Sequence, residues 1–154
     1  MKMKTKIKKD WYGRVKSAEE LYNDAKLWVS EINFINDEIR FLDRLLSSNY
    51  IDFLDAGLEE RVDRLVKKIV DERKVGSVLK KQIKVHKRIL FGLIKTNSVT
   101  SNKNYIEMHK TLERDMHIYL RKYKRIKKSI FDIVENIMRK KEQKRLSTTS
   151  NLPI

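Results

Sequence analysis

The sequence has no cysteine, and it has only four glycines and one proline among its 154 residues. The absence of cysteine excludes a disulfide scaffold, a cysteine zinc site and a cysteine nucleophile. So few glycines and prolines argue against a β-sandwich or β-barrel, because those folds need many tight turns. The longest apolar run, residues 89–94, is interrupted by Gly92 and falls far short of the ~18 residues of a membrane span.

The amino-terminal residues do not resemble a targeting segment. Residues 1–9 carry five lysines, and no apolar segment of the kind found in a signal peptide follows them. We therefore predict a basic, solvated N-terminal tail over residues 1–9. With no membrane span and no targeting signal, we expect a cytoplasmic protein.

Charge is abundant and unevenly distributed. Hydrophobic residues make up 40% of the chain, which is enough for a core, and charged residues make up 37%, with a net charge of +15. Residues 11–60 contain five basic and eleven acidic residues, whereas residues 61–154 contain 26 basic and nine acidic residues. A single acidic segment therefore precedes a strongly basic one.

Three apolar stripes with alternating spacings of four and three residues predict three long amphipathic helices. The helices are expected at about residues 17–47, 57–96 and 102–141, within one domain over residues 10–143, followed by a disordered tail over 144–154. Short connections favour antiparallel neighbours. The predicted fold is all-α, an up-down-up bundle of three helices with coiled-coil-like packing, which a second subunit could complete into a larger assembly.

The stripe of the second helix contains three residues that an apolar core does not favour, Glu72, Gly76 and His86. A helical glycine is less favourable than alanine by about 1 kcal/mol, so Gly76 marks either a bend or a close backbone contact. Ser17 and Glu20 have the spacing of a capping box at the start of the first helix.

Folding the three helices back on one another places His and Glu residues at one level of the bundle. Imidazole nitrogen and carboxylate oxygen suit Zn, Fe or Mn, and bundle cores are common places for such ligands. The candidate metal ligands are His86, His109, Glu113 and Glu20. In the alternative interpretation, these side chains hydrogen-bond to one another and fix the register of the helices.

Carboxylates on the first two helices, Glu31, Glu38 and Glu72, are interpreted as partners in interhelical salt bridges, with Glu38 expected near Lys67 and Lys68 of the second helix. No nucleophile motif, glycine-rich phosphate loop or substrate cleft accompanies them, so the sequence favours a protein that is not an enzyme.

Clusters of lysine and arginine on the second and third helices point away from the apolar stripes. Such a surface attracts phosphate backbones by neutralising their charge and releasing counterions, without reading bases. The candidate polyanion-binding residues are Lys80, Lys81, Lys84, Lys87, Arg88, Arg121, Lys122, Lys124, Arg125 and Lys128. A charged outer face is also commonly just solvated.

The sequence thus predicts a helical-bundle interaction or scaffold protein. Its basic surface is expected to meet nucleic acid, an acidic protein or another polyanion, and the chain is a candidate homo-oligomer. The alternative is a metal-binding bundle.

Overall fold

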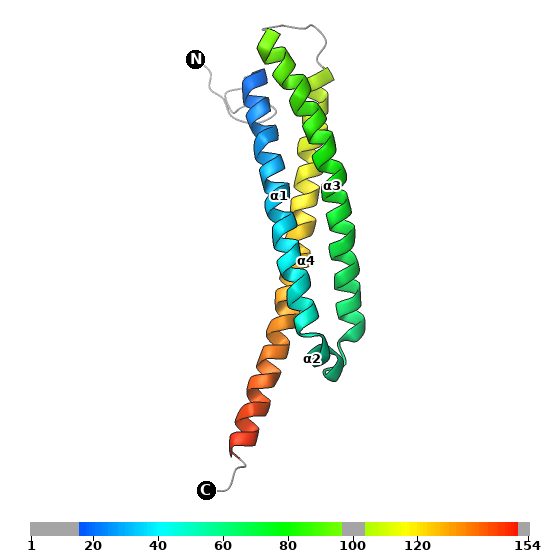
Figure 1. Ribbon diagram of the computed structural model, residues 1–154, viewed down its shortest axis with the longest axis vertical. Coiled ribbons are helices and arrows are strands. Elements are labelled where there is room, and N and C mark those ends of the chain that lie inside the picture. Colours follow the sequence, from blue (N-terminus) through cyan, green and yellow to red (C-terminus); the bar gives the residue numbers. More distant parts are fainter. Residues whose placement is uncertain (1–15, 97–103, 151–154) are drawn as a thin grey trace. The chain divides into compact units, whose positions relative to one another are not determined.

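The computed structural model describes residues 16–96 and 104–150, and every regular element in this part of the chain is a helix. In chain order the elements are α1 (Ala18–Ser48), α2 (Tyr50–Asp55), α3 (Glu59–Thr96) and α4 (Asn104–Ser150) (Figure 1). The described residues contain no strand. The all-α class is therefore confirmed, with three long helices and one short one.

A capping box fixes the start of α1, as predicted. The Ser17 N–H donates to Oε1 of Glu20 at 2.8 Å, and the Glu20 N–H donates to Oγ of Ser17 at 3.2 Å. Two N–H groups that lack partners inside the helix are thereby satisfied at its first turn.

The connection between the first two long helices contains a helix that the sequence analysis did not predict. α2 ends in a Schellman motif, in which Leu58 N–H donates to the Phe53 carbonyl at 2.9 Å and Gly57 N–H to the Leu54 carbonyl at 3.0 Å. Gly57 has a φ of +72°, which only glycine adopts without strain. Phe53 is completely buried and anchors this short helix to the core.

α4 continues to Ser150, beyond the predicted helix end at about residue 141 and into the segment 144–154 that was predicted to be a disordered tail. An ion pair at helical spacing supports the extension, because Arg145 pairs with Glu142. Lysine, arginine, glutamate and glutamine also favour helix intrinsically. The predicted basic tail over residues 1–9 lies outside the described residues.

The chain divides into two compact units, and every contact below lies within one of them. Unit 1 contains the described part of Met1–Asn36 together with Lys74–Leu120, and unit 2 contains Asp37–Arg73 together with the described part of Arg121–Ile154. Each unit therefore takes one segment from each of α1, α3 and α4.

The predicted apolar stripes form the core. On α1, Ile32, Ile39 and Leu42 are fully buried, and α3 and α4 bury their stripes in the same way, at Ile83 and Ile130 for example. This burial is the packing expected of a helical bundle. Among the described helices, none combines the length and apolar character that crossing a bilayer requires.

Candidate functional site

A pair of buried histidines joins α3 to α4 in unit 1. His86 is 1% exposed and His109 is 2% exposed, and Nε2 of His86 lies 2.9 Å from Nδ1 of His109. The sequence analysis placed these two residues at one level of the bundle, and the structure brings them into direct contact. One proton shared between the two nitrogens satisfies both.

The carboxylate that completes this cluster comes from Asp24 of α1. Its Oδ2 lies 3.1 Å from Nε2 of His109 and 3.0 Å from Nζ of Lys16. Trp28, also on α1, packs against the His109 ring with 4.6 Å between ring centroids. The result is a chain of polar contacts from Lys16 through Asp24 and His109 to His86.

The contacts favour one arrangement of protons. The Asp24 carboxylate can only accept, so Nε2 of His109 donates to it, and in a neutral His109 ring Nδ1 then accepts from Nε2–H of His86. Nδ1 of His86 then carries a lone pair, and it has no hydrogen-bond partner among the described residues. Burial, followed by the neighbouring His109, lowers the pKa of His86 to about 4, so the His86 ring is neutral at pH 7.

Asp24 remains ionised in this cluster. Burial alone raises its pKa, but hydrogen bonds from His109 and Lys16 outweigh that effect and hold the pKa below its ordinary value. An ionised Asp24 fixes the orientation of the His109 ring.

The two carboxylates predicted to join the histidines come from the first turn of α1 and from α4. Glu20 accepts the capping-box hydrogen bond from Ser17, because its backbone lies in the first turn of α1. Glu113 is half-buried on α4. Among the described residues, no group of three or more His, Asp or Glu side chains is arranged to hold a metal ion. The two facing ring nitrogens, Nε2 of His86 and Nδ1 of His109, would bind a metal only in place of the proton between them, and two ligands are fewer than the three or four protein ligands of most zinc sites.

Gly76 allows a close contact within unit 1. A Cβ at this position would lie 2.7 Å from the Tyr119 hydroxyl oxygen and 3.1 Å from two atoms of the Tyr119 ring. Tyr119 is 1% exposed, so its ring has little room to move. The glycine therefore makes space for a buried tyrosine in a helix that continues without interruption from Glu59 to Thr96.

Unit 2 buries a carboxylate with no hydrogen bond among the described residues. Glu72 of α3 is 1% exposed, and neither of its carboxyl oxygens has a partner there. Burial raises its pKa to about 7, although the charge of Lys122 acts in the opposite direction. Glu72 therefore titrates near neutral pH.

Glu38 pairs with α4, whereas the sequence analysis placed it near lysines of the second helix. The Tyr123 hydroxyl donates to Glu38 Oε1, and Lys127 Nζ lies 2.9 Å from both carboxyl oxygens. Although burial raises the pKa of Glu38, these hydrogen bonds lower it below its ordinary value. Glu38 thus forms an interhelical salt bridge, with α4 as the partner. Glu31 is exposed.

The candidate polyanion-binding residues of α3 lie on the surface of unit 1. Lys81, Lys84 and Arg88 are exposed, whereas Lys80 and Lys87 are half-buried. None of the five forms an ion pair with another described residue, and Lys87 Nζ lies 6.0 Å from the ring centroid of Tyr22. Residues 74–96 of α3 contain seven lysines and arginines and no aspartate or glutamate.

The candidate residues of α4 lie on the surface of unit 2. Five cationic side chains are exposed here, namely those of Arg121, Lys122, Lys124, Arg125 and Lys128. Only Lys128 pairs with another described acid, at 3.1 Å from Asp132. The structure thus places the predicted cations in two groups, one in each unit.

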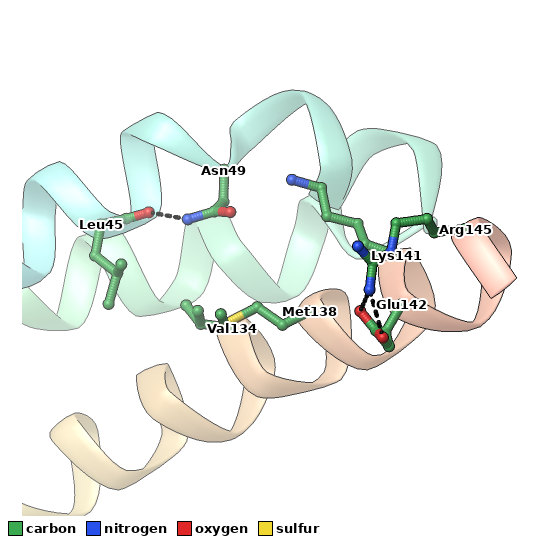
Figure 2. Close-up of a pocket in the computed structure, with 7 residues that line it drawn as sticks. All are labelled: Leu45, Asn49, Val134, Met138, Lys141, Glu142 and Arg145. Carbon is green, nitrogen blue, oxygen red and sulfur yellow. Dashed lines mark hydrogen bonds and ion pairs between the residues drawn. The ribbon is translucent and has the colours of Figure 1, made fainter.

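An open groove of about 430 Å³ separates α1 from α4 in unit 2. Figure 2 shows Leu45, Val134 and Met138 between the two helices, with polar side chains toward one end. The lining residues are Leu45, Asn49, Val134, Met138, Lys141, Glu142 and Arg145. The sequence analysis did not predict this groove. A second apolar row on α1, outside the buried stripe and ending one turn before Leu45, is the sequence signal that could have found it.

That second row, Leu27, Phe34 and Phe41, has heptad spacing, and the exposed fractions of its side chains are 63%, 63% and 48%. Apolar side chains that recur at helical spacing and remain exposed are typical of an unfilled interface.

Comparisons of the chain with models of protein families, with curated proteins and with solved structures give no significant match.

Proposed function

We propose that this chain is a non-enzymatic helical-bundle protein that binds nucleic acid or another polyanion through the exposed cations of α3 and α4. The proposal includes the up-down-up topology, with α1 and α4 parallel. In unit 2, Glu38 pairs with Lys127 and Asp52 with Lys141, so residue numbers increase together along α1–α2 and α4, which supports that direction.

The observation that carries the proposal is the uninterrupted positive charge of α3 over residues 74–96, seven cations with no acid. Surface helices usually mix charges of both signs, because alternating pairs stabilise the helix. Residues 59–73 of the same helix follow that rule, with five acidic and five basic residues. The change from a balanced to a purely cationic surface within one helix favours an anionic partner over simple solvation.

The physical mechanism is electrostatic. Lysine and arginine side chains neutralise phosphates along a backbone, and the released counterions supply the favourable free energy. Because no helix-turn-helix, zinc-finger or RNA-binding signature occurs in the sequence, we expect contacts to phosphate rather than to base edges.

The experiment compares two triple variants with the same change in charge on the same helix. The test variant changes Lys81, Lys84 and Arg88 to Gln, all three being exposed in the acid-free segment. The matched control changes Arg64, Lys67 and Lys68 to Gln, all three being exposed in the balanced segment. The affinity of each for a generic DNA duplex and for an RNA is measured by fluorescence anisotropy at about 50 mM salt.

We expect the test variant to bind at least about tenfold more weakly than the control, because each lost phosphate contact removes a released counterion. Equal affinities for the two variants would refute the proposal, since net charge alone would then explain the binding. If heparin binds and neither nucleic acid does, the nucleic-acid proposal is overturned and a sulfated polyanion takes its place.

Metal binding is the second candidate function. The observation in its favour is that Nε2 of His86 and Nδ1 of His109 face each other, while Asp24 orients His109 as an outer carboxylate often does in metal sites. A melting temperature raised by equimolar Zn²⁺, Fe²⁺ or Mn²⁺ in the wild type and unchanged in the His109→Ala variant would support it. Equal responses of the two proteins would exclude it.

Self-association is also part of the proposal, and the exposed apolar side chains of α1 and α4 support it. The cytoplasmic location expected from the sequence stays a prediction.

A further inference from the structure

We infer that the groove between α1 and α4 in unit 2 is the surface on which a second copy of this chain docks. The inference deepens the proposed self-association, and it rests on that part of the proposed function. It is carried by the exposed apolar side chains along the groove and by the opposite charges of its two walls.

The groove continues beyond its lining residues as an apolar strip. Phe41 lies one turn before Leu45 on α1, and Phe131 lies one turn before Val134 on α4, so each shares a face with a residue that lines the groove. The exposed fractions are 48% for Phe41, 43% for Phe131 and 61% for Met138. Met138 in the groove, together with Phe41 and Phe131 one turn beyond its lining, gives three large apolar side chains that the described residues of this unit leave about half exposed, as at an interaction site.

The shape of the groove suits helices. A further helix can pack into the groove between two neighbouring helices when each of them has exposed apolar residues at spacings of three and four. When two such faces meet, α1 and α4 of one copy and the same helices of the other surround a common apolar core, which is four-helix packing.

The charges select a second copy as the occupant. The segments that flank the groove differ in charge: residues 37–55 of α1 and α2 carry five acidic and two basic residues, and residues 121–150 of α4 carry eleven basic and three acidic residues. The pairs Glu38–Lys127 and Asp52–Lys141 form within the chain, and the other charges leave the two segments with opposite net sign. A two-fold axis parallel to α1 and α4 places the acidic wall of each copy against the basic wall of the other. A purely acidic partner would be attracted to the basic α4 wall but repelled by the acidic α1 wall.

The test measures the mass of the protein in solution by sedimentation equilibrium. One chain has a mass of 18.5 kDa, so a dimer has twice that mass. The test variant combines Phe131→Gln and Met138→Gln, which removes apolar surface without changing charge. The matched control combines Val78→Gln and Val85→Gln on α3, whose side chains are similarly exposed, at 57% and 49%.

We expect the wild type and the control to be dimers at about 100 µM, with the test variant at least about tenfold weaker in dimerisation. Higher salt should also weaken the wild-type dimer, because the walls attract each other electrostatically. Circular dichroism verifies the fold of each variant. If the test variant loses helicity, the Phe41→Gln variant on the other wall replaces it as the test. It should weaken the dimer to a similar extent.

A monomeric wild type at about 100 µM and low salt would overturn the inference, as would equal dimerisation of the test and control variants. Binding of a synthetic acidic amphipathic peptide to a monomeric wild type, lost in the test variant, would also overturn it and assign the groove to another partner. Nucleic-acid affinity is measured in parallel. The Gln variants of the groove keep every charge, so failure of dimerisation and failure of polyanion binding are separate results.

Discussion

Replacing Glu72 with glutamine should stabilise the protein above neutral pH. Its carboxyl is buried without a hydrogen bond among the described residues, and its pKa is raised from 4.5 in the unfolded chain to about 7 in the folded one. The folded state therefore favours the protonated acid. The stability that this preference gives is fully present below pH 4.5 and is lost as the pH rises through 7.

The difference between the two pKa values sets the size of the effect. Each pKa unit corresponds to about 1.4 kcal/mol, so ionisation of Glu72 destabilises the fold by at most about 3 kcal/mol at pH 8. Glutamine keeps the shape of the side chain and cannot ionise. Relative to the wild type, the Glu72→Gln variant should therefore gain up to about 3 kcal/mol between pH 4.5 and pH 8.

Urea unfolding followed by circular dichroism at pH 4.5 and pH 8 measures this gain. Glu31→Gln is the matched control, since it removes an exposed carboxylate on α1 and should change stability by less than about 0.5 kcal/mol at either pH. If the difference in unfolding free energy between the wild type and Glu72→Gln is the same at both pH values, burial does not raise the pKa of Glu72.

Three further substitutions test contacts of the core. Gly76→Ala should lower the free energy of unfolding by about 1–2 kcal/mol, because its Cβ would meet the Tyr119 ring. The loss should be smaller in a Tyr119→Phe background, and additive effects in a double-mutant cycle would contradict this contact. The His86→Leu variant should unfold at a lower pH than the wild type. The pKa of His86 is about 4 in the folded protein and 6.5 in the unfolded chain, so the wild type loses stability as the pH falls from 6.5 through 4. An unchanged midpoint of acid unfolding would contradict this prediction. Tyr123→Phe should cost about 1 kcal/mol in thermal unfolding, and less in a Glu38→Ala background, where the acceptor of its hydrogen bond is gone; equal losses in the two backgrounds would contradict this.

The fold class and most of the core could be predicted from the sequence because helical periodicity reports burial directly. The capping box of Ser17 and Glu20 could be predicted for a similar reason, since both ends of each hydrogen bond lie in one short segment. The short helix α2 could not, because its end depends on backbone hydrogen bonds around Gly57 and on burial of a single residue, Phe53.

The polar contacts show where such prediction stops. Connection lengths were enough to bring His86 and His109 to one level. They did not decide which carboxylate meets His109, and Asp24, one turn after Glu20, is the partner in the structure. When the geometry of the connecting loop is unknown, the relative position of two helices along their axes is uncertain by about one turn. Glu38 shows the same limit around the helix axis, because a modest rotation of α1 decides between α3 and α4 as its partner.

The salt dependence of duplex binding tests most directly whether the acid-free segment of α3 is the polyanion site. For B-form DNA the logarithm of the affinity falls with the logarithm of salt concentration by about 0.9 per phosphate contacted. Neutralising Lys81, Lys84 and Arg88 should therefore flatten the slope by about 2.7, whereas the control at Arg64, Lys67 and Lys68 should keep the slope of the wild type. Equal slopes for the two variants would contradict the proposed site.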